Sequence, residues 1–377
     1  MSKIIGLLIL FIYTSIFSQQ KINTNPWVKF SRDTIVNTKL QNAITHFLYE
    51  ANQGNFKTKY INSEHYKNNT YFFEQFENIF KSHYFKDSIF YKPYLIQSYS
   101  INKKDYYITL QFSGIDNDKK VITHKIIQFL AKFNADNYQI YCLFDENTKY
   151  WKRKTKKGVT FHYSNTFDKK KALRFVNFNK KLEQLTKHKS PILNYYKCKN
   201  PQEALAIFGI KYSIRYANAS SGFGMSDDYG NFITGIDSED YLHDHIHSFF
   251  SKIYNRKETW REFEEGIAIY YGGNWGVSLA TLKNKLREEL ISSPNFDFLT
   301  EFKKGRKGKR YDKLHIFDRV INAVFVEKII KTHGFDAAVK VMHCGNNGEK
   351  FFTLLHQKTG INESNFNSKL KELLNSN

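Results

Sequence analysis

Residues 238–276 read SEDYLHDHIHSFFSKIYNRKETWREFEEGIAIYYGGNWG. Within this stretch His243 and His247 stand four residues apart, so on an α-helix both imidazoles project from one face, within reach of a single ion. Glu265 follows on a second predicted helix. The stretch therefore predicts two successive helices that carry metal-ligand side chains.

The ends of both helices have sequence signals. Ser238 is the expected N-cap of the first, with Glu239 and Asp240 in its first turn. The segment from Thr259 to Glu262 has capping-box spacing, and glycines at 272 and 273 end the second helix. The first helix also has an apolar side that predicts burial, formed by Leu242, Ile246, Phe249, Phe250 and Ile253.

The combination of His-x-x-x-His with a downstream Trp and Glu-Gly-x-Ala-x-Tyr resembles the gluzincin zinc peptidases of the peptidase MA type. The resemblance implies that His243, His247 and Glu265 bind Zn²⁺ and leave a fourth position open, as hydrolytic zinc sites require. The segments IAIYYGG and NYYKCKNPQEALAIFGIKY (194–212) are similar to secreted bacterial members, so the likeness covers about residue 169 to the C-terminus. It implies an exported peptidase that acts on a peptide or protein substrate.

The ligand assignment has alternatives. His-x-x-x-His alone is compatible with an ordinary polar helix face, and joining it to Glu265-Gly266 makes metal binding the favoured interpretation. Glu264 could take the place of Glu265, although the position before glycine favours Glu265. His245 lies on another face of the helix and is expected not to bind.

One residue departs from the family. The family's general base is a Glu directly after the first His, and here that position is Asp244, whose carboxylate reaches about 1.5 Å less. We therefore expect an active but slow peptidase. The alternative is a catalytically impaired protein that binds peptides or an envelope partner, and a third class is a structural envelope protein without metal.

The resemblance implies two further site elements. An oxyanion donor is expected from Tyr311 or His315, while Tyr270 and Tyr271 are alternatives. The strand before the first helix is expected to be an edge strand that pairs with the substrate backbone, or else an interior strand. Its residues are Phe232, Ile233, Thr234, Gly235 and Ile236.

The start of the chain has the pattern of a cleaved signal peptide at residues 1–18. Lys3 precedes an apolar run from Ile4 to Phe17, which is too short for an ordinary spanning helix. No later segment is long and apolar enough to cross a membrane. We expect a protein without a membrane span that is periplasmic or secreted by a bacterium.

Charge and cysteine content narrow the function classes further. The formal net charge is +21, but the lysines are scattered rather than aligned, so nucleic acid is not the expected partner. The one basic cluster, residues 303–310, is interpreted as a solvated loop. Three widely spaced cysteines cannot form a disulfide framework, which leaves one bridge or buried thiols.

The whole chain of 377 residues predicts an α+β protein. Residues 19–165 form a module of helices followed by an antiparallel sheet, with hairpin turns at 102–105 and 134–137, an order similar to nuclear-transport-factor-2-like modules. Residues 166–276 form the metallopeptidase-like domain with the zinc-site helices. Residues 277–377 form a helical C-terminal subdomain.

Overall fold

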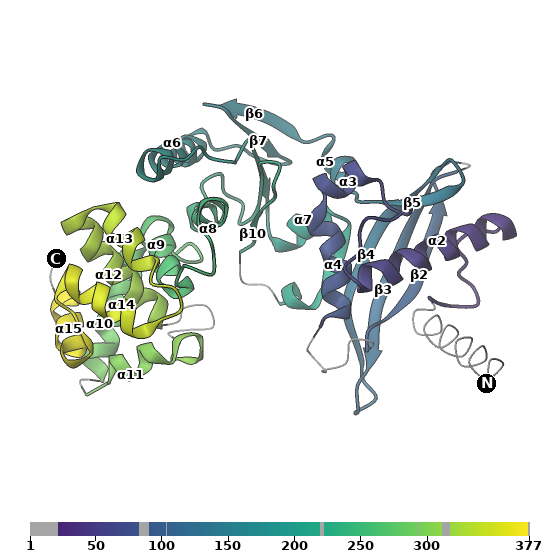
Figure 1. Ribbon diagram of the computed structural model, residues 1–377. Coiled ribbons are helices and arrows are strands. Elements are labelled where there is room, and N and C mark those ends of the chain that lie inside the picture. Colours follow the sequence, from purple (N-terminus) through teal and green to yellow (C-terminus); the bar gives the residue numbers. More distant parts are fainter. Residues whose placement is uncertain are drawn as a thin grey trace, which may run out of the picture. The chain divides into compact units, whose positions relative to one another are not determined.

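The computed structural model describes residues 22–82, 90–102, 104–218, 222–293, 295–310 and 317–375 (Figure 1). They form a mixed α+β protein with two sheets, as expected. Contacts divide the chain into two compact units, residues 1–151 with 199–220 and residues 152–198 with 221–377. This division differs from the expected boundary near residue 165. Residues 152–165, expected in the N-terminal module, belong to the second unit, and residues 199–220, expected after the boundary, belong to the first.

The first unit is a sheet with helices packed on it. Its sheet order is β1-β2-β3-β4-β5, and β9 pairs with β4 beside this path. The strands are β1 (Asn23–Thr24), β2 (Lys92–Ser100), β3 (Tyr106–Ile115), β4 (Val121–Asn134), β5 (Asn137–Tyr141) and β9 (Ile210–Ser213). The helices are α2 (Thr34–Asn52), α3 (Ser63–Asn68), α4 (Thr70–Phe80), α5 (Phe144–Thr148), α7 (Pro201–Ala206) and the 3₁₀ turn η1 (Ile214–Tyr216).

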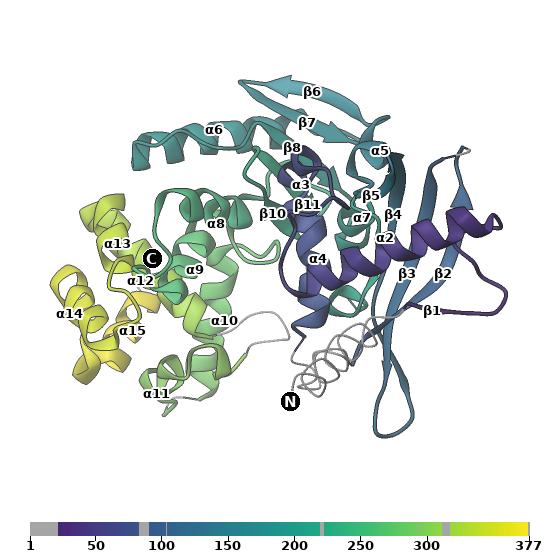
Figure 2. The ribbon, with the colours of Figure 1, turned by 45° about the vertical axis from the view of Figure 1, so that its right-hand side comes forward.

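Helices α2 and α4 lie along the sheet of this unit (Figures 1 and 2), and aromatic contacts join them to it. Phe76 of α4 contacts Phe47 of α2 on one side and both Phe112 of β3 and Phe129 of β4 on the other. Both predicted hairpins are confirmed, since β2 pairs antiparallel with β3 and β4 with β5. β9 adds to β4 in antiparallel register and so returns residues 199–220 to this unit.

The sheet of the second unit has the order β10-β11-β8-β7-β6. Its strands are β6 (Lys152–Lys156), β7 (Val159–Tyr163), β8 (Asn194–Cys198), β10 (Gly224–Ser226) and β11 (Asn231–Gly235). Helix α6 (Lys169–Thr186) has Asp168 as its N-cap, and its Phe175 packs on Tyr195 of β8 and Phe232 of β11. β6 and β7, expected in the N-terminal module, therefore belong to the sheet beside the metal-ligand helices.

Of the two expectations for residues 232–236, the edge strand is wrong and the interior strand is the one that the structure shows. β11 pairs with β8 on one side and with β10 on the other, so both of its edges are already hydrogen-bonded. Phe232, Ile233 and Thr234 are buried, and Ile236 follows the strand. The strand that ends the sheet on this side is β10, which runs antiparallel to β11.

The rest of the second unit is helical (Figure 2). Helices α8 and α9 share one hydrophobic core with the C-terminal helices, so residues 277–377 do not have a core of their own. The elements are α8 (Leu242–Ile253), α9 (Arg261–Gly272), α10 (Leu279–Ser292), α11 (Phe298–Lys303), η2 (Gly305–Lys307), α12 (Phe317–His333), α13 (Phe335–Met342), α14 (Gly348–Thr359), η3 (Glu363–Asn365) and α15 (Phe366–Asn375).

Both predicted helix starts in the 238–276 stretch are wrong. α8 begins at Leu242, because Glu239 turns inward to the buried amine of Lys197 at 3.2 Å and keeps the preceding segment out of the helix. α9 begins at Arg261, and Trp260 is the N-cap without a side-chain cap bond. The Trp260 N–H instead donates to the Met342 carbonyl at 2.8 Å, which ties this helix end to α13.

Three other expectations concern the chain as a whole. Among the described helices, none combines the length and apolar character needed to cross a bilayer. The predicted signal peptide, residues 1–18, lies outside the described residues. All three cysteines are buried and none forms a disulfide, so the alternative of one bridge is not realised.

Candidate metal centre

The ligand candidates come from two packed helices. His243 and His247 lie one turn apart on α8, and Glu265 lies in the middle of α9. A close backbone approach brings the helices together, because a Cβ on Gly272 of α9 would lie only 2.4 Å from the backbone nitrogen of His243. A side chain at position 272 would thus push α8 and its histidines away.

Three ligand atoms converge between these helices. His243 Nε2 lies 3.3 Å from His247 Nε2 and 3.5 Å from Glu265 Oε2, and the third side of the triangle is 3.6 Å. His243 and Glu265 are each 6% exposed, and the side chain of His247 is 11% exposed. Among the described residues, no other group of three His, Cys, Asp or Glu side chains brings its ligand atoms together in this way. The cluster could hold a metal ion.

A hydrogen bond from Nδ1 fixes the orientation of each imidazole ring, that of His243 and that of His247. His243 Nδ1 donates to the Gly273 carbonyl oxygen at 2.6 Å, and His247 Nδ1 donates to Glu264 Oε1, also at 2.6 Å. In the neutral imidazole that metal binding requires, the other nitrogen carries the lone pair, so Nε2 is the atom of each ring that would face a metal ion. Metal-binding histidines are held in this way by carbonyl and carboxylate partners.

The two adjacent glutamates have separate positions. Glu264 accepts from His247 and from Arg261 Nη1 at 2.7 Å, so it supports a ligand rather than joining the triangle. Glu265 Oε2 accepts no well-formed hydrogen bond from the described residues, although Arg319 Nη1 of α12 lies 3.2 Å away. The structure therefore favours Glu265 over Glu264 as the ligand.

The charges in the cluster are strongly coupled. Burial alone would raise the pKa of Glu265, but contacts with His243 and His247 and the charge of Arg319 hold it well below its usual value. Burial alone would lower the pKa of His247, but its interactions with Glu264 and Glu265 raise it to about 9. Because a proton and a metal ion use the same lone pair, metal binding here would displace a proton.

Asp244 lies beside the cluster. Burial raises the pKa of its carboxyl above the usual value, while the charges of His243 and His247 and a hydrogen bond with Tyr241 oppose the rise. Its carboxylate also touches the edge strand, since a Cβ on Gly224 of β10 would lie 2.2 Å from Asp244 Oδ2. The Asp244 carboxyl thus lies between the three ligand candidates and the strand that ends the sheet.

The remaining candidate site residues either pack elsewhere or lie outside the described residues. His245 points the other way, as expected, and its ring packs between Phe175 and Phe232. Tyr270 and Tyr271 pack against the helical core. Tyr311 and His315, the predicted oxyanion donors, lie outside the described residues.

Sequence reasoning missed several residues around the cluster. The pairing of Arg261 with Glu264 follows helical i, i+3 spacing and was open to prediction from the sequence. Arg319 had no such signal, because α12 is far from α9 in sequence. Gly224 had none either, since its role depends on where β10 passes Asp244.

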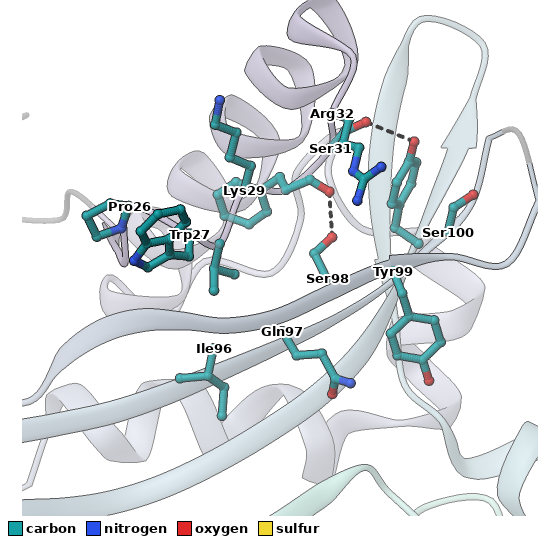
Figure 3. Close-up of a pocket in the computed structure, with 13 residues that line it drawn as sticks. Pro26, Trp27, Lys29, Ser31, Arg32, Ile96, Gln97, Ser98, Tyr99 and Ser100 are labelled. Atoms are coloured by element: carbon teal, nitrogen blue, oxygen red, sulfur yellow. Dashed lines mark hydrogen bonds between the residues drawn. The ribbon is translucent and has the colours of Figure 1, made fainter.

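The first unit contains a pocket of about 860 Å³ next to β2 (Figure 3). Residues 26–32 form one wall and residues 96–100 of β2 the other. Ser98 Oγ donates to the Phe30 carbonyl at 2.5 Å, and the hydroxyls of Ser31 and Tyr106 are 3.2 Å apart, which holds the two walls together. Trp27 is exposed. No titratable cluster like that of the second unit lies among the described residues of this pocket.

Comparisons with protein-family models, with curated proteins and with solved structures find no match to this chain. The function is therefore argued from the site itself.

Proposed function

We propose that this chain is an exported zinc-dependent peptidase of the gluzincin type, which hydrolyses peptide bonds. The observation that carries the proposal is the convergence of His243 Nε2, His247 Nε2 and Glu265 Oε2, each held by its own second contact. Two His and one carboxylate with no fourth protein ligand is the donor set of hydrolytic zinc sites, whereas structural sites are closed by four.

The triangle has the size that zinc requires. Tetrahedral coordination at about 2.0–2.1 Å places ligand atoms about 3.3 Å apart. The observed separations are 3.3, 3.5 and 3.6 Å, so small side-chain movements would complete the set. The nitrogen and carboxylate donors favour zinc over calcium or magnesium, which prefer oxygen ligands.

The protein's own groups would supply positioning and proton transfer. Zinc, when bound, polarises a carbonyl and lowers the pKa of water. Asp244 would accept the proton of the attacking water and pass it to the leaving amine. β10, which ends the sheet beside Asp244, would hold an extended peptide by backbone hydrogen bonds. Tyr311 or His315 would stabilise the developing oxyanion.

The second candidate is a peptide-binding protein without turnover. The observation that favours it is Asp244 itself, because its carboxylate is about 1.5 Å shorter than the Glu expected at this position. In that case zinc and the sheet edge would remain, and proton transfer would fail. Acid–base catalysis is typically worth about 10²–10⁴-fold, so poor geometry is sufficient to suppress activity.

The first experiment measures the metal. Elemental analysis of the purified mature protein should find about one zinc per chain, and His243→Ala should remove it. The matched control is His356→Ala, an exposed histidine on α14, which should keep the zinc. A wild type without zinc, or full zinc content in His243→Ala, would rule the metal assignment out.

The second experiment separates the two functions. Digestion of a broad peptide library should show cleavage by the wild type, none by Asp244→Asn with zinc still bound, and equal or greater cleavage by Asp244→Glu. A wild type that binds zinc and peptide but cleaves nothing, together with activity gained in Asp244→Glu, would establish the binding protein instead.

A further inference from the structure

A pocket of about 700 Å³ lies within the second unit, away from the three metal-ligand candidates. Residues from α9, α11, α12 and α14 line it, together with the loop before α14, and none of His243, His247 and Glu265 does. Its polar floor includes Asp318 and Asn322 of α12 and Glu262 of α9. The pocket is therefore a separate feature that peptide hydrolysis at the metal cluster does not explain.

Three oxygen atoms in this floor are buried without a partner. Asp318 is 2% exposed and Asn322 is 1% exposed. Neither carboxylate oxygen of Asp318, nor the side-chain oxygen of Asn322, has a well-formed hydrogen bond in the described parts of the chain. The amide nitrogen of Asn322 donates to the Asp318 backbone carbonyl at 2.9 Å, which fixes the amide so that its oxygen is the atom left over.

Such atoms are costly in a folded protein. A buried polar group without a hydrogen bond loses its hydration without compensation, and the loss is greatest for a charged group. Burial raises the pKa of Asp318 to about 6, Arg319 favours the ionised form, and Glu262 and Glu265 oppose it. An ionised Asp318 carboxylate has no counter-ion at hydrogen-bonding distance among the described residues.

The lysine that lines the pocket already has a carboxylate partner. Lys303 Nζ pairs with Glu363 at 2.9 Å and lies over the ring of Phe352 at 5.9 Å. The pocket walls also include the aromatic rings of Trp260 and Phe302. Acceptor oxygens at the base and aromatic faces at the side are the two kinds of group that bind ammonium and guanidinium ions.

We propose that this pocket binds an organic cation, a guanidinium or ammonium group such as that of a basic side chain, with Asp318 and Asn322 as its acceptors. All the unpartnered atoms are acceptors, and these two cations are pure donors. The volume of about 700 Å³ is in the range of small-molecule sites and accommodates a whole arginine or lysine residue.

A metal ion fits the pocket less well. Among the described residues, the Asp and Glu side chains that line it do not bring three ligand atoms together, in contrast to the cluster at His243. A guanidinium group spans a larger distance and needs only two or three acceptors in its plane. The proposal does not depend on peptidase activity, because it concerns residues outside the metal centre.

Calorimetric titration of the full-length mature protein tests this proposal. The probe is N-acetyl-arginine amide, and its neutral counterpart is N-acetyl-citrulline amide, which has nearly the same shape without the charge. The arginine probe should bind at least about 10-fold more tightly, as expected for a charge-assisted hydrogen bond. Asp318→Asn should abolish this difference, and Asp336→Asn, an exposed carboxylate on α13, should preserve it.

Two further measurements keep the test decisive. Zinc content and melting temperature establish that Asp318→Asn is folded, and Glu262→Gln at the half-buried wall should weaken the arginine probe by a smaller factor. Equal binding of the arginine and citrulline probes, no binding of either, or calcium binding that Asp318→Asn removes would overturn the proposal.

Discussion

Glu264 and Glu265 are neighbours in sequence that contact different atoms. One step along an α-helix turns a side chain by about 100°, so adjacent residues cannot point at the same atom. Glu265 thus reaches Nε2 of both histidines, whereas Glu264 reaches Nδ1 of His247. Arg261 pairs with both carboxylates, more closely with that of Glu264. Glu264 fixes the ring of His247 and raises the pKa of that imidazole, but it is not part of the triangle formed by His243, His247 and Glu265.

We expect Glu264→Gln to weaken zinc binding by about 10–100-fold without abolishing it, because outer contacts of metal-binding histidines typically have this effect. The amide keeps the shape but loses the charge that polarises His247 and pairs with Arg261. Competition with a chromophoric chelator measures the affinity. Glu288→Gln, an exposed residue on α10, is the control, and unchanged affinity in Glu264→Gln would exclude the supporting role.

Lys125 is a buried lysine in the first unit. It is 5% exposed, and its amine donates to the Gln75 side-chain oxygen at 2.6 Å without a carboxylate partner in the described contacts. Burial, with a smaller effect from Arg215, lowers its pKa to about 7. The unfolded chain has an ordinary lysine pKa, so it holds this proton more tightly than the folded protein does.

The free energy of unfolding should therefore rise with pH between about 7 and 10.5, because the unfolded state binds more protons in this window. The residue contributes a slope of at most about 1.4 kcal/mol per pH unit. Lys125→Met should remove this contribution, as judged by denaturant unfolding of the first unit at several pH values. Lys92→Met, an exposed change on β2, should retain the wild-type slope, and an equal slope in Lys125→Met would contradict the assignment.

At the scale of elements, the helix pair α9–α12 determines the geometry of the centre. Gly266, next to Glu265, lies against α12, where a Cβ would be 2.7 Å from the backbone carbon of Asn322. This close approach brings Arg319 to Glu265 and places Asp318 and Asn322 beside α9. Gly266 thus permits the close helix packing that shapes both the cluster of ligand candidates and the neighbouring pocket.

Gly266→Ala should lower the free energy of unfolding by about 1–3 kcal/mol, the usual cost of overpacking, and should also weaken zinc binding. The clash is with backbone atoms, which cannot rotate away. Gly348→Ala at the start of α14 meets nothing within 4 Å and should be close to neutral. Denaturant unfolding and the chelator assay measure the two effects, and a neutral Gly266→Ala would show that the helices can separate without loss.

At the scale of the whole molecule, the chain passes between its two units more than once. It leaves the first unit after residue 151, returns for residues 199–220 and leaves again. A fragment that starts near residue 168 would lack β6 and β7 and would expose the edge of β8. The expected modular boundary therefore does not define a fragment that folds with a complete sheet.

Metal binding should stabilise the second unit alone, because all three ligand candidates lie in it. A ligand present at 1,000 times its dissociation constant stabilises the folded state by about 4 kcal/mol. Removal of zinc by a chelator should therefore lower the midpoint temperature of one calorimetric unfolding transition and leave that of the other unchanged. His243→Ala should show no response to chelator, and equal shifts of both transitions would contradict the separation of the units.

Local sequence pattern was sufficient for much of this protein. The helical spacing of His243 and His247 and the choice of the glutamate before Gly266 depend only on residues a few positions apart, and the structure brings these three side chains together. Both hairpins follow from short turns between strand-like runs. These features are local because helical periodicity and tight turns are set by neighbouring residues.

Tertiary structure alone decided the rest. Glu239 was expected in the first turn of a helix, but it lies before the helix and pairs with Lys197 on a strand distant in sequence. The sequence left the strand at residues 232–236 open between an edge and an interior position, and pairing with β10 and β8 makes it interior. Pairing with β4 likewise places β9 in the first unit. The packing of α12 brings Arg319 to Glu265 and places Asp318 in the pocket lining. In each case the deciding partner lies far away in sequence, and no local pattern encodes which distant surfaces will meet when apolar area is buried.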